Sequence, residues 1–387
     1  MRCSIFNLSL LTNVIPKVWK SAFFIPLLKE GDPTILNHYR PISKLSVLAK
    51  VVEYLVSEQV KEYLATKSIL SISQSGFCKK HSTSTAALKV INDITEALDN
   101  KQCCLSLLID FSKAFDTVDH DIFTEYLQQL GFLYMQLDGL QTILKTEARP
   151  VHKGVPQGSV LGLLLFSLYL NNIGMNISNA ALHFYAEDAV IYCFGPTPAE
   201  VFAYLQNAFN RVQEQLCQLQ LVLNADKTKL VFFTNFKSAR SSQSVIVTTN
   251  GQQIELVSTF KYLGFLIDEH LSFKAHIQYT VKKLKLLLGF YFRNKSCFSF
   301  RVKQKLVEST FLPIIDYGDV LYMNASAQYL YMLDGVYHVA LRFITSCGAQ
   351  SHHCVLYSKV IWPPLYVHRL GHWYALIYKA ILIYHPF

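Results

Sequence analysis

The apolar positions of this chain follow two periodicities, which predict strands in its middle and helices around and after them. Apolar runs bounded by turn residues predict strands at residues 22–28, 229–234, 244–248 and 260–267. A turn is expected at residues 30–33, where Gly31, Asp32 and Pro33 interrupt the apolar pattern. A loop rich in glycine and proline is expected at residues 154–162, before a helical apolar run.

Apolar residues three and four positions apart predict helices in three further segments. The expected buried stripes are Leu45, Leu48, Val52 and Leu55; Ala87, Val90, Ile91, Ile94 and Leu98; and Val201, Leu205, Phe209, Val212, Leu216 and Leu219. After residue 268 the pattern is helical and basic. Strands followed by a mainly helical end predict an α+β core with a helical appendage.

Further apolar runs, which also predict strands, lie beside acidic residues. One apolar run leads into Asp110, and a second pair of apolar runs brackets Glu187 and Asp188. Unpaired acids are costly to bury. Two such strands therefore suggest carboxylates that converge on a divalent metal, as in-line phosphoryl transfer requires.

Composition narrows the class of protein. The chain has 387 residues, of which 51% are hydrophobic and 16% charged, enough for a large core in two or three lobes. The longest near-continuous apolar run, residues 160–170, is too short to span a bilayer. Asn7 and Asn13 interrupt the N-terminal run, which favours an internal element over a signal peptide.

The nine cysteines show no pairing rhythm, and their odd number fits a reducing compartment better than a disulfide framework. Zinc ligation is one interpretation of the group Cys347, His352, His353 and Cys354. Its spacing matches no closed finger, so ordinary buried cysteine is the favoured interpretation.

The net charge of +9 is concentrated in one segment. Residues 270–307 contain no Asp or Glu but nine Lys and Arg, which equals the whole surplus. Such a cationic segment is typical of a protein that binds a polyanion, and nucleic acid is favoured over a solvated helix face, which usually carries both signs.

The order of motifs resembles that of reverse transcriptases from non-LTR (LINE-type) retrotransposons, from about residue 15 to the C-terminus. The resemblance implies a right-hand polymerase with fingers, an antiparallel palm sheet and a mainly helical C-terminal region. Fingers and palm would occupy residues 15–268, and the thumb and C-terminal region residues 269–387. The motifs that carry it lie at residues 16–32, 37–43, 74–77, 110–120, 154–162, 185–188, 223–229 and 260–264.

The resemblance implies a role for each motif. Asp110, Glu187 and Asp188 would hold two Mg²⁺ ions, with Mn²⁺ as an alternative, and Lys227 would act on the leaving pyrophosphate. Phe115 would form a wall beneath the sugar that selects deoxynucleotides. The remaining nucleotide-binding residues would be Arg40, Phe111, Pro156, Gln157 and Gly158.

The same resemblance implies partners. Tyr262, Leu263 and Gly264 would steady the primer end, and Lys282, Lys283 and Lys285 would bind duplex. The expected partners are an RNA template, a DNA primer and deoxynucleoside triphosphates, with no membrane and no endonuclease domain in this chain. An intracellular location, nucleus or cytoplasm, is implied by the family.

The sequence departs from the family pattern at several positions. Glu187 replaces an aspartate, Cys78 an arginine and Leu163 a proline, and the segment 117–153 is shorter by a helix-sized block. Residual or absent catalysis is therefore expected. The alternatives are a nucleic-acid-binding remnant without catalysis and a non-functional product of the element.

Overall fold

The computed structural model describes residues 22–29, 31–78, 81–132, 153–175, 177–235 and 245–384, with Phe6, Leu8, Ser9, Thr12, Pro16 and Trp19. The chain forms two compact units. The first comprises Met1–Ser82, Lys101–Leu230 and Phe236–Leu256, and the second Thr83–Asn100, Val231–Asn235 and Val257–Phe387.

The first unit is built on a mainly antiparallel sheet with the strand order β4-β5-β3-β6-β7. Strands β4 and β5 form a hairpin that pairs with β3, whereas the short β7 runs parallel to β6. Nearly every residue of β3 is buried, which explains its continuous apolar sequence. The strands are β3 (Cys103–Ile109), β4 (Ala181–Tyr185), β5 (Asp188–Gly195), β6 (Lys229–Phe233) and β7 (Glu255–Leu256).

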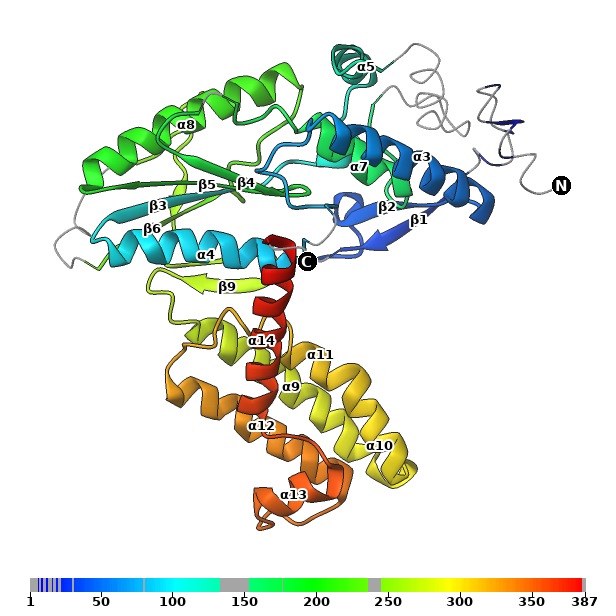
Figure 1. The fold of residues 1–387 in the computed structure, drawn as a ribbon, viewed down its shortest axis with the longest axis vertical. Coiled ribbons are helices and arrows are strands. Elements are labelled where there is room, and N and C mark those ends of the chain that lie inside the picture. The colour runs from blue at the N-terminus through cyan, green and yellow to red at the C-terminus, as the bar shows by residue number, and fades with distance from the viewer. Residues whose placement is uncertain are drawn as a thin grey trace. The chain divides into compact units, whose positions relative to one another are not determined.

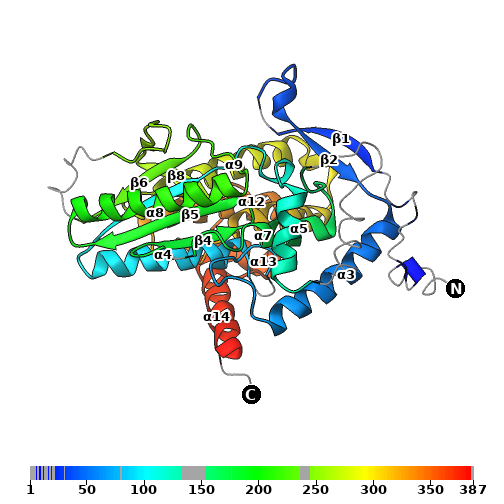
Figure 2. The same ribbon diagram turned by 90° about the horizontal axis from the view of Figure 1, so that it is seen from above.

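Helix α8 (Pro198–Gln218) lies along this sheet, against β3 and β5 (Figure 1 and Figure 2). Its N-terminus is capped by Thr197, whose side chain accepts a hydrogen bond from the backbone of Glu200. The stripe predicted from the sequence is buried as far as Leu216, and Leu219 is the C-cap. The amphipathic pattern was therefore sufficient to predict this helix and its buried face.

Helix α3 (Val47–Thr66) packs against α7 (Val160–Tyr169). The stripe predicted for α3 is partly wrong, because Leu48 and Leu55 are exposed. Its buried face instead includes two polar residues, Glu53 and Ser57. Glu53 bonds to the N-terminus of α7, so a polar contact that is invisible to hydrophobic periodicity decides which side of α3 faces inward.

A two-stranded antiparallel sheet precedes α3. It consists of β1 (Phe23–Leu28) and β2 (Tyr39–Lys44), which pair from Phe23 and Lys44 to Leu28 and Tyr39. Helix α5 (His120–Gln129) follows β3 and is capped by the Asp119 carboxylate. No strand forms at residues 245–248, where one isolated bridge joins Val247 to Gln253. The side-chain amide of Gln206 accepts a hydrogen bond from the Val247 N–H and donates one to the Val247 carbonyl. These two backbone groups therefore pair with no neighbouring strand.

The second unit is mainly helical. Helix α4 (Thr83–Asp99) buries most of its predicted stripe, and β8 (Thr259–Tyr262) forms a hairpin with β9 (Phe265–Asp268). Helix α9 packs on α12. In the described part of the chain, no helix is long and apolar enough to cross a membrane. The remaining helices are α9 (Lys274–Arg293), α10 (Phe300–Leu306), α11 (Leu312–Ile315), α12 (Ala327–Thr345), α13 (His353–Val360) and α14 (Leu365–Tyr384).

Candidate active site

The pairing of β3 with β5 brings the acids of the two motifs together. Ile109 is the last residue of β3 and pairs with Ala189 in an antiparallel ladder. One step further in this register, Asp110 faces Asp188. Asp188 also closes the β4–β5 hairpin opposite Tyr185, so that Ala186 and Glu187 form its two-residue turn. The sheet thus gathers the acids at one end of adjacent strands.

The turn at Ala186 is held from outside the sheet by residues 74–76. Ala186 has a φ of +55°, which is uncommon for a residue with a side chain. Its N–H donates to the side-chain oxygen of Gln74 at 3.3 Å, and Ser75 N–H donates to the carbonyl of Phe184 at 2.9 Å. The segment therefore supports the backbone that carries Glu187.

A second loop fixes the backbone of Asp110. Asn224 N–H donates to the Asp110 carbonyl at 2.9 Å, and Asp110 N–H donates to the Thr228 hydroxyl at 3.3 Å. Thr228 in turn donates to the Asn224 carbonyl. The Thr228 hydroxyl explains the threonine of this motif, since it attaches the loop that carries Lys227 to the end of β3, whereas Asn224 contributes backbone groups to these bonds.

The acids repel one another electrostatically. Burial, together with the negative charges of Glu187 and Asp110, raises the pKa of Asp188 to about 6. The positive charges of Lys29 and Arg40 act in the opposite direction. Asp188 is nevertheless partly open to solvent, so its carboxylate lies at the rim of the site rather than in the core.

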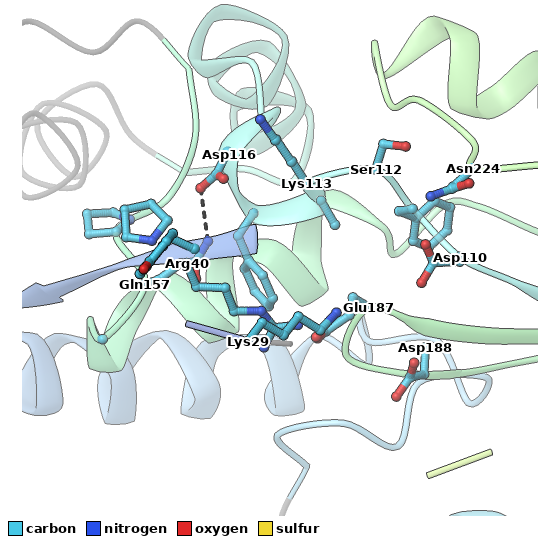
Figure 3. Close-up of a pocket in the computed structure, with 18 of the residues that line it drawn as sticks. Lys29, Arg40, Asp110, Ser112, Lys113, Asp116, Gln157, Glu187, Asp188 and Asn224 are labelled. Carbon is cyan, nitrogen blue, oxygen red and sulfur yellow. Dashed lines mark hydrogen bonds between the residues drawn. The ribbon is translucent and has the colours of Figure 1, made fainter. Parts of the chain in front are cut away.

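The acids line a cavity of about 680 Å³, within the usual range for a small-molecule site. Figure 3 shows Asp110, Glu187 and Asp188 in this cavity, with Lys29 and Arg40 approaching from the neighbouring hairpin. Of the residues predicted from the sequence, the same cavity is lined by Arg40, Phe111, Phe115, Pro156, Gln157, Gly158 and Lys227.

Sequence reasoning missed several lining residues. Lys29, Tyr39, Lys113, Asp116 and Asn224 also face the cavity. All five lie inside motifs that the sequence analysis identified, so motif membership was an available signal for them.

The glycine-rich loop is bound to the segment after β3. Gln157 donates its amide N–H to the Asp116 carboxylate at 3.0 Å, the dashed contact of Figure 3. Gly158 has a φ of +113°, and a Cβ on it would stand 2.5 Å from the Ser43 carbonyl oxygen. Ser43 N–H also donates to the Gln157 carbonyl, so the loop passes close to β2.

Phe115 is half-buried between the cavity and α7. Its ring lies 4.4 Å, centroid to centroid, from that of Phe166, which is fully buried. This tilted ring contact fixes one side of Phe115, which also contributes to the cavity wall.

Glu53 is a further residue that sequence reasoning missed. Its side chain is 5% exposed and accepts hydrogen bonds from Ser159 Oγ at 2.9 Å and Val160 N–H at 2.7 Å. Burial raises the pKa of Glu53, although both hydrogen bonds favour the carboxylate. The contact attaches α3 to the end of the glycine-rich loop. No local pattern predicted it, because its partners lie more than 100 residues away.

The positions that depart from the family pattern have different surroundings. Cys78 lines a separate cavity with Gln74 and Phe77, and its thiol donates to the Gln74 carbonyl. Leu163 lines the main cavity. Lys79, Lys80 and most of the shortened segment, residues 133–152, lie outside the described residues.

The proposed primer and duplex residues belong to the second unit. Leu263 and Gly264 form the turn of the β8–β9 hairpin, both with positive φ, and Tyr317 donates its hydroxyl proton to the Leu263 carbonyl. Lys282, Lys283 and Lys285 are exposed on α9. Lys303, one of the nine cations of residues 270–307, is 8% exposed and donates to Ser346 Oγ while lying over the Phe343 ring, so it is not available to a polyanion.

The donor set of the cavity fits a hard divalent cation. Mg²⁺ prefers carboxylate oxygens, and it would offset both the burial and the neighbouring negative charges that raise the pKa of Asp188. The three acids lie at the cavity end of adjoining segments, and the cations Lys29, Arg40 and Lys227 surround them. This arrangement suits a ligand that carries phosphates.

A mainly antiparallel sheet that presents paired acids beside a glycine-rich loop is the palm of a right-hand polymerase. A family model, "Reverse transcriptase (RNA-dependent DNA polymerase)", matches residues 27–267. The chain belongs to this family, and its relatives are those of LINE-type retrotransposons.

Two such relatives come from Drosophila melanogaster. The RNA-directed DNA polymerase from mobile element jockey is 27% identical over 353 residues, covering 84% of this chain and 38% of the relative. The probable RNA-directed DNA polymerase from transposon BS is 28% identical over 369 residues, covering 89% of this chain and 40% of the relative. The chain thus spans about two fifths of the length of these relatives.

Among solved structures, a telomerase chain from Candida albicans matches 93% of this chain and 67% of its own length, with 10% identity and a TM-score of 0.44. This likeness is too low to add to the assignment.

Proposed function

We propose that this chain carries out RNA-directed DNA polymerisation, as the palm, fingers and thumb of a retrotransposon reverse transcriptase. The observation that carries the proposal is the meeting of Asp110, Glu187 and Asp188 in one cavity, opposite Lys29 and Arg40. We assign the fingers and palm to residues 15–268 and the thumb and C-terminal region to residues 269–387.

The acids would hold Mg²⁺, or Mn²⁺, which supplies charge neutralisation at the reacting phosphate and lowers the pKa of the attacking hydroxyl. Asp110 and Asp188 are the natural pair, because they face one another across two hydrogen-bonded strands. Glu187 carries the same charge as aspartate, but its extra methylene moves the carboxylate by about an ångström.

The cations of the cavity would bind the triphosphate. Lys29 and Arg40 come from the β1–β2 hairpin, and Lys227 comes from the loop that is bonded to Asp110. An arginine guanidinium can bind phosphate oxygens in bidentate fashion, which orients the nucleotide as well as attracting it.

The side chain of Phe115, held by its contact with Phe166, would lie beneath the sugar and exclude a 2′-hydroxyl by steric contact. Gln157 would present its amide toward nucleotide or template, and its bond to Asp116 keeps the side chain in place. The turn of residues 262–264 would support the primer end, and Lys282, Lys283 and Lys285 would contact the duplex backbone.

The replacements at Glu187 and Cys78 favour a second candidate function. A displaced carboxylate together with a missing arginine suits a protein that binds nucleic acid without catalysis. The test is incorporation of one deoxynucleotide on a primed RNA template, with duplex binding measured on the same preparation. Incorporation supports the enzyme. Duplex binding by a cooperatively folded chain, with no incorporation in Mg²⁺ or Mn²⁺, supports the binding protein.

A further inference from the structure

A second group of metal-ligating side chains lies in the helical unit and plays no part in the proposed polymerase chemistry. It consists of Asp316 and Asp319, in the turn after α11, and His368 and His372, on the first two turns of α14 (Figure 1). Ligand atoms of Asp316, His368 and His372 all lie within 4.8 Å of one another.

The spacing of the two histidines suits ligation. Residues four positions apart lie on one face of a helix, and the rings of His368 and His372 are 4.5 Å apart, centroid to centroid. The N-terminus of α14 is fixed by a bond from His368 N–H to the Pro364 carbonyl. The two rings therefore face the same space from a defined helix end.

One oxygen of Asp316 is buried and makes no hydrogen bond among the described residues. This Oδ1 lies 3.3 Å from Nδ1 of His368, and the contact raises the pKa of His368, so a metal would take the place of the proton on that ring. A buried acceptor without a partner is costly. A separation of about 3.3 Å equals the edge of a tetrahedron of ligands around Zn²⁺, at zinc–ligand distances of about 2.0–2.1 Å.

Asp319 has a different role in the group. Its side chain is 3% exposed, and its Oδ2 lies 2.7 Å from Nδ1 of His372, so it accepts a hydrogen bond from that nitrogen. A carboxylate that binds one ring nitrogen fixes the orientation of the ring and leaves the other nitrogen free to bind metal.

The charge of these four side chains also suits a divalent cation. Burial raises the pKa of Asp319, and the charges of His372, Asp316 and His368 also affect it, so these side chains lie close to one another. Arg369 is a buried cation on the same helix, and its charge acts on Asp334 and Tyr322. With neutral histidines, the two carboxylates match the charge of one divalent cation.

We propose that Asp316, His368 and His372 bind a divalent cation of the zinc class, with Asp319 positioning His372. The ligands come from segments about 50 residues apart in the sequence, so the metal would join α14 to the turn after α11. This site is independent of the polymerase cavity, because none of its residues lines that cavity.

The test uses the full chain, freed of metal with a chelator and then titrated with Zn²⁺ and, separately, Co²⁺. We expect one equivalent to bind, a rise in Tm of about 5 °C at Zn²⁺ well above Kd, and a visible Co²⁺ spectrum without a thiolate band. His368→Gln and His372→Gln should abolish tight binding of this one equivalent of Zn²⁺. Asp316→Asn should weaken the affinity for Zn²⁺ at least tenfold.

The matched control is the exposed group His352, His353 and Cys354 on α13, which offers similar ligands. The double variant His352→Gln/His353→Gln should bind Zn²⁺ as the original chain does. If this variant loses the tight equivalent, or if Co²⁺ shows a thiolate band, the site is on α13 and the proposal is wrong. Absence of tight binding in a chain that melts cooperatively also overturns it.

Discussion

Gly76 lies so close to Ala186 that a Cβ on it would stand 2.2 Å from the Ala186 nitrogen. This contact joins the finger motif at residues 74–77 to the turn that carries Glu187. The nearest atoms belong to the backbone, so a side chain at Gly76 could be accommodated only by moving the turn. The motif therefore determines where the acids lie.

We expect Gly76→Ala to lower nucleotide incorporation about 100-fold, because an ångström of misplacement can cost that much. Overpacking should also lower the free energy of unfolding by about 1–3 kcal/mol, measured by urea titration. Gly335→Ala on α12 is the control, since a Cβ there meets nothing within 4 Å. Equal activity in the two variants would show that Gly76 does not position the turn.

Glu53 should contribute to stability through its bonds to the start of α7. Glu53→Ala leaves Ser159 Oγ and Val160 N–H without their acceptor, so the free energy of unfolding should fall by about 1–3 kcal/mol. Glu53→Gln retains an acceptor and should cost less. Glu58→Ala on the same helix removes a partly exposed pair with Lys61 and should change stability by less than about 1 kcal/mol. A loss in Glu58→Ala as large as in Glu53→Ala would contradict this account.

The raised pKa of Asp188 predicts a pH-dependent stability. The folded chain holds this proton more tightly than the unfolded chain, in which the pKa is near 3.8. The corresponding stabilisation is present below about pH 4 and is lost as the pH rises through about 6. Asp188→Asn, which is uncharged at every pH, should therefore raise Tm relative to the original chain more at pH 8 than at pH 5.

Because Asp188 is partly exposed, the difference should be small, and a set of buffers at constant ionic strength is needed to measure it. Asp226→Asn, outside the three acids, is the control. A Tm difference between Asp188→Asn and the original chain that does not change with pH would mean that Asp188 does not titrate in this range.

The exposed lysines of α9 should set the salt dependence of duplex binding. The logarithm of affinity should fall with the logarithm of salt concentration by about 0.9 per phosphate neutralised on B-form duplex. Reversal of charge at Lys282, Lys283 and Lys285 should flatten this slope, whereas Lys67→Glu, outside the cationic segment, should leave it unchanged. An unchanged slope in the triple variant would place the binding surface elsewhere.

The sequence was sufficient to predict helix α8, the strands that carry the acids and the named nucleotide-binding residues of the cavity, because each depends on local periodicity or on the order of motifs. It did not predict several further lining residues, and no strand forms at residues 245–248, where one was expected. It could not predict which side of α3 is buried, since Glu53 is placed by a partner 106 residues away. For a similar reason it could not show that Lys303 is buried, as Ser346 and Phe343 lie about 40 residues beyond it.

The most direct measurement compares single-nucleotide extension on a primed RNA template by the original chain, Asp110→Asn and Glu187→Asp. Electrostatic attraction for Mg²⁺ is nearly equal for Glu187 and aspartate, so only the position of the carboxylate differs. Glu187→Asp should raise incorporation about tenfold or more, equivalent to about 1.4 kcal/mol of barrier. Asp110→Asn should abolish incorporation with either residue at position 187. Incorporation that survives Asp110→Asn, or that falls in Glu187→Asp, would contradict the account.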